Sequence, residues 1–245
     1  MSEVELQPPA GERYPFWGYK DLALFIGLSL PALILGAILV RLSLWLLRLR
    51  IPFPAAELLS AQFLGYGLLF LSLYLVLRLH YRRPFWRSLG WVAAPIRNRM
   101  LVIYGVLLAV LVAGAGALLR TPDIDSPLKQ LLSDPRSAVM VGLFAVTLGP
   151  LCEELAFRGF IQPLLVRSLG ALPGIFATAV PFGLLHLQQN AFSWRHGLLI
   201  TLAGVVFGWV RHRSGSTRAA AIMHAAYNGT FFALLLIQKR WETLS

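Results

Sequence analysis

Residues 138–160 read AVMVGLFAVTLGPLCEELAFRGF, an apolar run of 15 residues that continues directly into Glu153, Glu154 and Arg158. The apolar part alone is shorter than the roughly 20 residues that an α-helix needs to cross a bilayer. Because the helical pattern continues to about Val166, the sequence predicts either one long helix with charges near its middle or a broken pair of helices. In both cases charged side chains enter the membrane, which indicates a helical membrane protein with a polar interior.

Six further apolar runs give the rest of the chain the same character. At about 1.5 Å of rise per residue, the runs of 19 or 20 residues reach ~28–30 Å, the thickness of a hydrocarbon core. Period-two alternation is missing, which disfavours a transmembrane β-barrel. We predict an all-α fold, a polytopic transmembrane bundle of about seven or eight helices that encloses a polar intramembrane cavity. The six runs cover residues 22–40, 58–77, 101–119, 171–187, 197–210 and 219–237.

The composition agrees with this fold class. Of the 245 residues, 57% are hydrophobic and 13% are charged, which does not describe a water-soluble globular protein. The apolar runs leave no room for a second folded domain, so we expect one transmembrane domain over residues 21–240. We expect residues 1–20 to lie at the membrane interface, because an aromatic cluster that includes Tyr14 and Trp17 would gain from the headgroup region. The single cysteine, Cys152, excludes an internal disulfide.

The net charge of +11 resembles that of a nucleic-acid-binding protein, but Lys and Arg lie in short segments between the apolar runs. Membrane orientation explains this distribution better, so we expect membrane lipids as partners and no nucleic acid. With seven spans, alternate connecting segments place 13 Lys and Arg on the side of the amino terminus and 9 on the other. This excess favours a cytoplasmic amino terminus in a multi-pass protein, which we assign to a bacterial inner membrane.

The carboxy-terminal half holds ionisable groups inside its apolar runs, where a charge costs on the order of 2.5–3.5 kcal/mol. Glu154 and Arg158 are four residues apart, so on a helix they share one face and can pair. Glu153 is turned about 100° away from Glu154, which leaves it free to face a cavity. We interpret Glu154 and Arg158 as a structural ion pair and Glu153 as the surplus acid.

Two later runs carry polar pairs at the same spacing, Phe182 with His186 and His224 with Asn228. Alone, each buried histidine or asparagine would be explained equally well by interior hydrogen bonding. Three such segments in one chain favour a site assembled from three helices. One feature opposes this site: if every run crosses fully, His186 and His224 lie toward opposite faces. Convergence then requires a kink at Pro181 or an offset or re-entrant segment.

A carboxylate, two imidazoles and an amide suit the activation of water for attack on a carbonyl. Glu153 would take the proton from water, and His186 would orient or share that proton. His224 and Asn228 would donate hydrogen bonds to the oxyanion, where one preorganised donor is worth ~3–4 kcal/mol. Glu153, His186 and His224 equally form a three-ligand zinc set with an open water position, and the residues alone leave both mechanisms open.

The motifs EExxxR, FxxxH and HxxxN, in this order, resemble those of the CAAX protease and bacteriocin-processing family of intramembrane proteases. This family includes type II CAAX prenyl endopeptidases and bacterial abortive-infection proteins, and the resemblance covers residues 138–230. It implies an intramembrane endopeptidase with catalytic Glu153 and His186, an oxyanion site at His224 and Asn228, and no required metal. The substrate would be a membrane-associated peptide or protein, prenylated if the reaction is of the CAAX type. The supporting residues would be Glu154, Arg158 and Phe182.

Two other classes of protein compete with this interpretation. A non-proteolytic immunity or scaffold protein would keep the fold and use the polar cluster to bind a partner. A proton-coupled transporter would titrate Glu153 during alternating access, but it predicts inverted-repeat symmetry, which we do not see between the two halves. The HExxH and GxGD motifs of other intramembrane proteases are missing, and no GxSx segment has a suitably placed histidine.

Overall fold

The computed structural model describes residues 14–51 and 53–242, and every regular element in this part of the chain is a helix. The predicted all-α class is therefore confirmed. Among these residues, five helices are long and apolar enough to cross a membrane, and the apolar helix Ala171–Leu185 is shorter. The five membrane-length helices are Tyr19–Leu46, Pro54–His80, Asn98–Leu118, Pro135–Leu169 and Thr217–Gln238.

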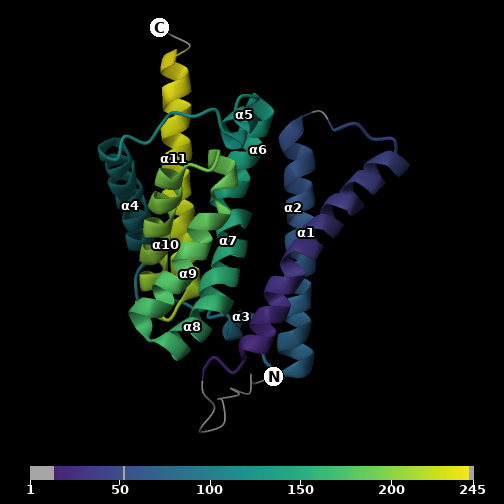
Figure 1. Ribbon diagram of the computed structural model, residues 1–245, viewed down its shortest axis with the longest axis vertical. Helices are drawn as coiled ribbons and strands as arrows, with labels where there is room; N and C mark the ends of the chain where they lie inside the picture. The colour runs from purple at the N-terminus through teal and green to yellow at the C-terminus, as the bar shows by residue number, and fades with distance from the viewer. Residues whose placement is uncertain (1–13, 52, 243–245) are drawn as a thin grey trace.

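Each of the seven predicted apolar runs falls on helical structure (Figure 1). The shortest run, 197–210, is part of a 21-residue helix that continues past the apolar stretch at both ends. The long helices are α1 (Tyr19–Leu46), α2 (Pro54–Leu75), α4 (Asn98–Leu118), α6 (Pro135–Val146), α9 (Ala171–Leu185), α10 (Trp194–Ser214) and α11 (Thr217–Glu242). The short elements between them are η1 (Val76–His80), α3 (Phe85–Ser88), α5 (Pro127–Leu131) and η3 (Gln188–Asn190).

Residues 135–169 form a helical column with one break, which decides between the two predicted alternatives. The column begins after Asp134, whose carboxylate accepts a 2.7 Å hydrogen bond from the backbone N–H of Ser137. This bond caps α6 and lowers the pKa of Asp134 below its ordinary value. At Thr147 the backbone leaves helical geometry, with φ −128° and ψ −87°, so the break lies before the charged residues. The elements after the break are α7 (Leu148–Glu154), the π-helical turn η2 (Leu155–Ile161) and α8 (Gln162–Leu169).

The last helix, α11, packs against α4, α6, α7 and α10 and so forms the centre of the bundle. Its closest neighbour is α4, where a Cβ on Gly105 would come 2.7 Å from the Cβ of Ala226. The π-helical turn η2 contacts α9, α10 and α11. The charged segment of the chain is therefore surrounded by the helices that carry the two predicted histidines.

Helices α1 and α2 form a separate pair on one side of the bundle (Figure 1). They cross closely because both carry glycine at the crossing: a Cβ on Gly36 would come 2.7 Å from the backbone nitrogen of Gly65. The pair joins the bundle through contacts between α2 and α6 and through Phe25 of α1, whose ring lies 5.1 Å from that of Phe160 in η2. Most of the large apolar side chains of α1 are exposed, which suits a helix that faces lipid.

The described part of the segment before α1 packs onto the protein. Trp17 is fully buried, its indole N–H donates a 3.0 Å hydrogen bond to the carbonyl of Phe160, and its ring stacks on that of Phe160. Its ring therefore contacts protein instead of headgroups, because the indole has both an apolar neighbour and an acceptor inside the fold. Tyr14 donates to the carbonyl of Ser88. Residues 1–13 of the predicted interfacial segment lie outside the described residues.

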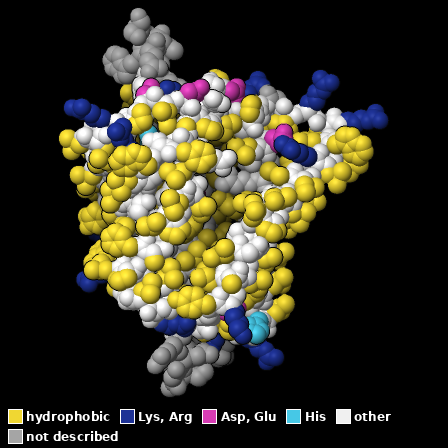
Figure 2. Space-filling model, in the orientation of Figure 1, with side chains coloured by type: hydrophobic (Ala, Val, Ile, Leu, Met, Phe, Trp, Pro, Cys, Tyr) yellow, Lys and Arg dark blue, Asp and Glu magenta, His cyan; other side chains and the backbone are white. Residues whose placement is uncertain are grey.

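The surface shows how the molecule would sit in a bilayer. Figure 2 shows hydrophobic side chains over the middle of the visible face and charged side chains at its two ends. The same view shows a recess between the α1–α2 pair and the rest of the bundle. A broad apolar band between two charged ends is what a protein embedded in lipid requires.

Candidate active site

The predicted site residues come from three parts of the bundle that meet around η2. Glu153 and Glu154 end α7, and Arg158 lies in η2. Phe182 belongs to α9, and His186 is the residue that directly follows this helix. The remaining two, His224 and Asn228, lie one turn apart on α11.

Glu154 and Arg158 form the predicted ion pair, with 3.1 Å between Glu154 Oε1 and Arg158 Nη1. Both side chains are completely buried. Arg158 also donates a 2.8 Å hydrogen bond to the carbonyl of Gly204, and its guanidinium lies 4.5 Å from the centre of the Phe182 ring. A buried pair survives only with such additional partners, and the aromatic ring supplies a cation–π contact.

His224 is held by the same carboxylate. Its Nδ1 lies 2.9 Å from Glu154 Oε1, and its ring stacks on Phe207 at 4.6 Å between centres. Because Glu154 Oε1 already accepts from Arg158, this oxygen acts as an acceptor, and His224 Nδ1 carries the hydrogen. The other ring nitrogen, Nε2, then points toward Glu153, 3.8 Å from its Oε2.

His186 is oriented by its own helix. Its Nδ1 lies 2.7 Å from the carbonyl oxygen of Phe182, four residues earlier. A carbonyl only accepts, so His186 Nδ1 carries the hydrogen and Nε2 of the neutral ring keeps its lone pair. This Nε2 lies 3.9 Å from Glu153 Oε2. Phe182 thus contributes both its backbone to His186 and its ring to Arg158.

Glu153 Oε2 therefore lies between the Nε2 atoms of His186 and His224. The side chains of Glu153 and His186 are each 20% exposed, whereas Glu154 has no exposed surface. The 100° turn expected between the two glutamates is thus visible as a difference in burial. When both rings are neutral, Glu153 Oε2, His186 Nε2 and His224 Nε2 are all hydrogen-bond acceptors. The space beside these atoms therefore favours a hydrogen-bond donor or a cation.

The length of α9 explains how His186 and His224 can lie close together, although full spans would place them toward opposite faces. This helix has 15 residues and follows a sharp turn at Gly170, where φ is +88°. At about 1.5 Å per residue it rises only roughly 22 Å, less than a full crossing. The sequence predicts that convergence of the two histidines requires a kink, an offset helix or a re-entrant segment. In the structure, the short helix α9 allows this convergence.

Asn228 also contacts a neighbouring helix. Its Nδ2 donates a 2.8 Å hydrogen bond to the carbonyl of Ala145 on α6. Among the described residues, no hydrogen bond joins Asn228 to Glu153, His186 or His224. One of its two amide hydrogens therefore links α11 to α6, close to the break at Thr147, and the other remains for a ligand.

The three residues of the zinc alternative are not assembled as a metal site in this arrangement. In the part of the chain that the structure describes, no group of three or more His, Cys, Asp or Glu side chains is placed so that it could hold a metal ion. Tetrahedral zinc with ligands at about 2.0–2.2 Å would bring neighbouring donor atoms to roughly 3.4 Å. The separations of 3.8 and 3.9 Å at Glu153 are wider, and we derive no chemical step through a metal.

Sequence reasoning missed the residues that position the charged pair. A Cβ on Gly204 would come 3.1 Å from Arg158 Nη2 and 3.2 Å from the Phe182 ring, so glycine is what lets the guanidinium reach the backbone of α10. Gln162, one turn after Arg158, donates in the same way to the carbonyl of Gly208. The only signal in the sequence was the spacing of four between the two glycines, which alone indicates close helix packing.

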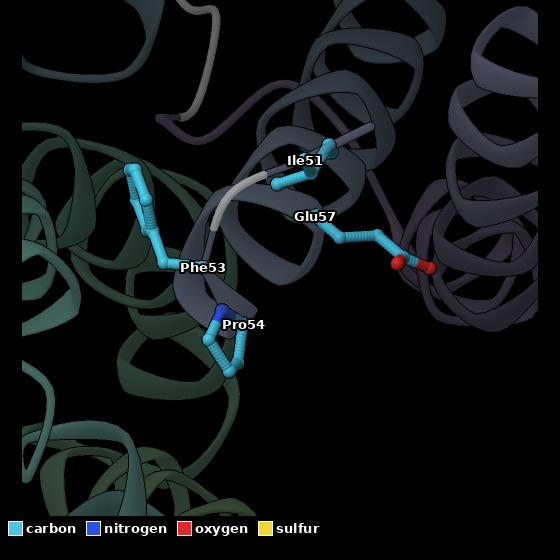
Figure 3. Close-up of a pocket in the computed structure, with 4 residues that line it drawn as sticks. All are labelled: Ile51, Phe53, Pro54 and Glu57. Atoms are coloured by element: carbon cyan, nitrogen blue, oxygen red, sulfur yellow. The ribbon is translucent and has the colours of Figure 1, made fainter. Parts of the chain in front are cut away.

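The cavities with a measured volume lie away from this site. One of about 290 Å³ is lined by Ile51, Phe53, Pro54 and Glu57 at the start of α2. Figure 3 shows Phe53 and Glu57 pointing to different sides of this pocket. Glu57 is paired there with Arg41 of α1 at 2.8 Å. The enclosed polar cavity around Glu153 stays a prediction.

The fold and the site first define a class of protein: a protein with membrane-length helices whose interior holds two glutamates, an arginine and two histidines in mutual contact. Within this class, residues 135–230 match the family model described as "Type II CAAX prenyl endopeptidase Rce1-like". The family resemblance is thereby confirmed, and the matched residues include all seven predicted site residues. No curated protein and no solved structure gives a significant match to the chain. The match covers 96 of the 245 residues, and together with the five membrane-length helices it indicates a multi-pass membrane protein that is similar to this family over residues 135–230.

Proposed function

We propose that the chain is an intramembrane endopeptidase in which Glu153 activates water for attack on a peptide carbonyl. The observation that carries this proposal is the position of Glu153 Oε2, 3.8 Å from His224 Nε2 and 3.9 Å from His186 Nε2. These separations are too long for direct hydrogen bonds, and they leave room for one water molecule that donates one hydrogen to Glu153 Oε2 and the other to His186 Nε2, at about 2.8 Å from each acceptor.

In the proposed reaction, Glu153 accepts a proton from this water while the water oxygen bonds to the carbonyl carbon. The carbonyl oxygen becomes an oxyanion, and the proton then passes to the amide nitrogen as the C–N bond breaks. His186 aids the first step, because the Phe182 carbonyl fixes its ring so that Nε2 can accept a hydrogen bond from the water.

His224 and Asn228 serve the oxyanion in this proposal. As a donor to the oxyanion, His224 would use Nε2, because its Nδ1 already contacts Glu154 Oε1 at 2.9 Å. Arg158 in turn holds Glu154 in place. Asn228 would use the amide hydrogen that does not bind Ala145.

We propose a membrane-associated peptide or protein as the substrate, because Glu153 and His224 both lie inside membrane-length helices. A prenylated CAAX-type chain is one member of this class. We also place the amino terminus in the cytoplasm of a bacterial cell. The α2–α4 connection, the α8–α9 turn and the α10–α11 turn lie at the same end of the bundle as the start of α1 (Figure 1), and together with the helix ends beside them they carry ten of the 19 arginines.

The test uses purified protein in lipid nanodiscs, incubated with a peptide library with and without a zinc chelator. We expect cleavage that resists the chelator and disappears in His186→Ala, which rules out a contaminating protease. A folded wild-type protein that cleaves no member of the library would favour the scaffold or transporter classes. Cleavage that the chelator abolishes would replace direct water activation by a metal mechanism.

A further inference from the structure

Helix α2 lies outside the residues that match the family model, yet it carries a polar pair in its apolar middle. Gln62 and Tyr66 are one turn apart, and Gln62 Nε2 donates a 2.8 Å hydrogen bond to Tyr66 Oη. Both side chains are half-buried, so the protein covers part of each. Polar side chains within a membrane-length helix are costly, and they are retained where the helix faces the protein interior or a water-filled space.

Tyr66 faces the candidate active site. Its ring stacks on Phe144 of α6, with 6.5 Å between the ring centres and 26° between the planes. The next residue, Ala145, is the one whose carbonyl binds Asn228 of the predicted oxyanion site. Tyr66 is also close enough to Glu153 to interact with it electrostatically. The ring of Tyr66 thus lies beside the part of α6 that binds Asn228.

The hydrogen-bond pattern leaves the Tyr66 hydroxyl as a donor. Its oxygen accepts from Gln62, and no hydrogen bond from the hydroxyl to an acceptor joins it to any described residue. The rest of the site is rich in acceptors: His186 and His224 both use Nδ1–H for internal bonds, and one hydrogen of Asn228 is engaged. Hydrolysis needs donors where negative charge develops on the carbonyl oxygen.

We propose that the Tyr66 hydroxyl donates a hydrogen bond to the scissile carbonyl oxygen of the substrate as that oxygen becomes negative. This inference rests on the proposed function. Gln62 is a positioning residue. Its amide donates a hydrogen bond to Tyr66 Oη, so the phenolic hydrogen points away from Gln62. Asn228 and Tyr66 then approach the substrate from opposite walls, α11 and α2.

The experiment compares Tyr66→Phe with Tyr74→Phe, the same substitution two turns later on α2. Tyr74 is 43% exposed, and its ring contacts Phe85. Each variant loses one hydroxyl and keeps its ring, and kcat and KM are measured in nanodiscs on a peptide that the wild-type protein cleaves. We expect Tyr66→Phe to lower kcat on the order of 100-fold with KM within about threefold of wild type, because the bond strengthens in the transition state. Tyr74→Phe should match the wild type.

Gln62→Met is a second variant, which keeps Tyr66 and removes its orienting donor. We expect kcat to fall on the order of 10-fold, and this variant tests the same bond if Tyr66→Phe fails to fold. A kcat for Tyr66→Phe within twofold of wild type, or a rise in KM alone, overturns the inference. The proposed function fails separately, when wild type does not cleave or His186→Ala still does.

Discussion

Glu153 and Glu154 are neighbours in the chain, and their surroundings assign them different tasks. Glu154 is completely buried and binds both Arg158 and His224. Glu153 is partly exposed and has two imidazole nitrogens at 3.8 and 3.9 Å. Two carboxylates in different environments can divide structural and chemical roles between them. In the proposed mechanism, Glu154 therefore acts through His224, whereas Glu153 faces the substrate.

Glu154→Gln should destabilise the protein strongly, because it leaves the buried guanidinium of Arg158 without a counter-charge. Removing one partner of a buried pair costs about 3–5 kcal/mol. The matched control is Glu57→Gln, which breaks the Arg41 pair at the surface, where side chains are 42% and 77% exposed. That change should cost less than about 1 kcal/mol. Thermal unfolding in detergent measures the stability of both variants. Equal melting temperatures would contradict the expected difference between the buried and the exposed ion pair.

At the scale of single residues, the sequence allowed the local geometry to be predicted but not the contacts between helices. The pairing of Glu154 with Arg158 at a spacing of four, and the different direction of Glu153, follow from helical periodicity alone. The bond between His224 and Glu154 joins residues 70 positions apart, and no local pattern predicts it. The same holds for Tyr66, because nothing in the sequence of α2 says which side of it meets α6.

At the scale of elements, the site depends on three irregularities: the break at Thr147, the π-helical turn Leu155–Ile161 and the short helix α9. The apolar runs predicted where helices lie, since hydropathy decides that in a membrane. They did not predict a π-helical turn, which inserts a residue without changing hydropathy. Such turns occur often at functional sites, and this one carries Arg158.

Gly105→Ala should loosen the contact between α4 and α11, the helix that carries His224. The added Cβ would come 2.7 Å from Ala226 Cβ and 3.1 Å from the backbone nitrogen of Tyr227, so α11 must shift. Such overpacking costs about 1–3 kcal/mol, and we expect the cleavage rate to fall along with the melting temperature. Gly114→Ala on the same helix meets nothing within 4 Å and is the control. A Gly105→Ala protein as stable and active as Gly114→Ala would show that the close approach is not needed.

At the scale of the whole molecule, the alternation of helices places the connections in two groups, one at each end of the bundle (Figure 1). The all-α class and the seven helical stretches were predictable, because lipid permits few other solutions. The position of α1 and α2 beside the bundle was not predictable. Their exposed apolar side chains do not indicate which helix they contact, because the surrounding lipid is equally apolar.

The orientation follows from basic residues and can be checked with single cysteines. In a Cys152→Ser background, Arg97→Cys lies before α4 at the arginine-rich end, and Asp123→Cys lies at the other end. A membrane-impermeant thiol reagent on intact bacterial spheroplasts should label position 123, and it should label position 97 only after permeabilisation. The reverse pattern would place the amino terminus outside.

The central claim is that Glu153 activates water between His186 and His224, and the cleavage rate of Glu153→Gln tests it most directly. Glutamine keeps the size of the side chain and removes the base. The account predicts a kcat at least on the order of 1,000-fold below wild type, with an unchanged melting temperature, because general-base catalysis and the placement of water are lost together. A folded Glu153→Gln protein that cleaves within tenfold of the wild-type rate would contradict it.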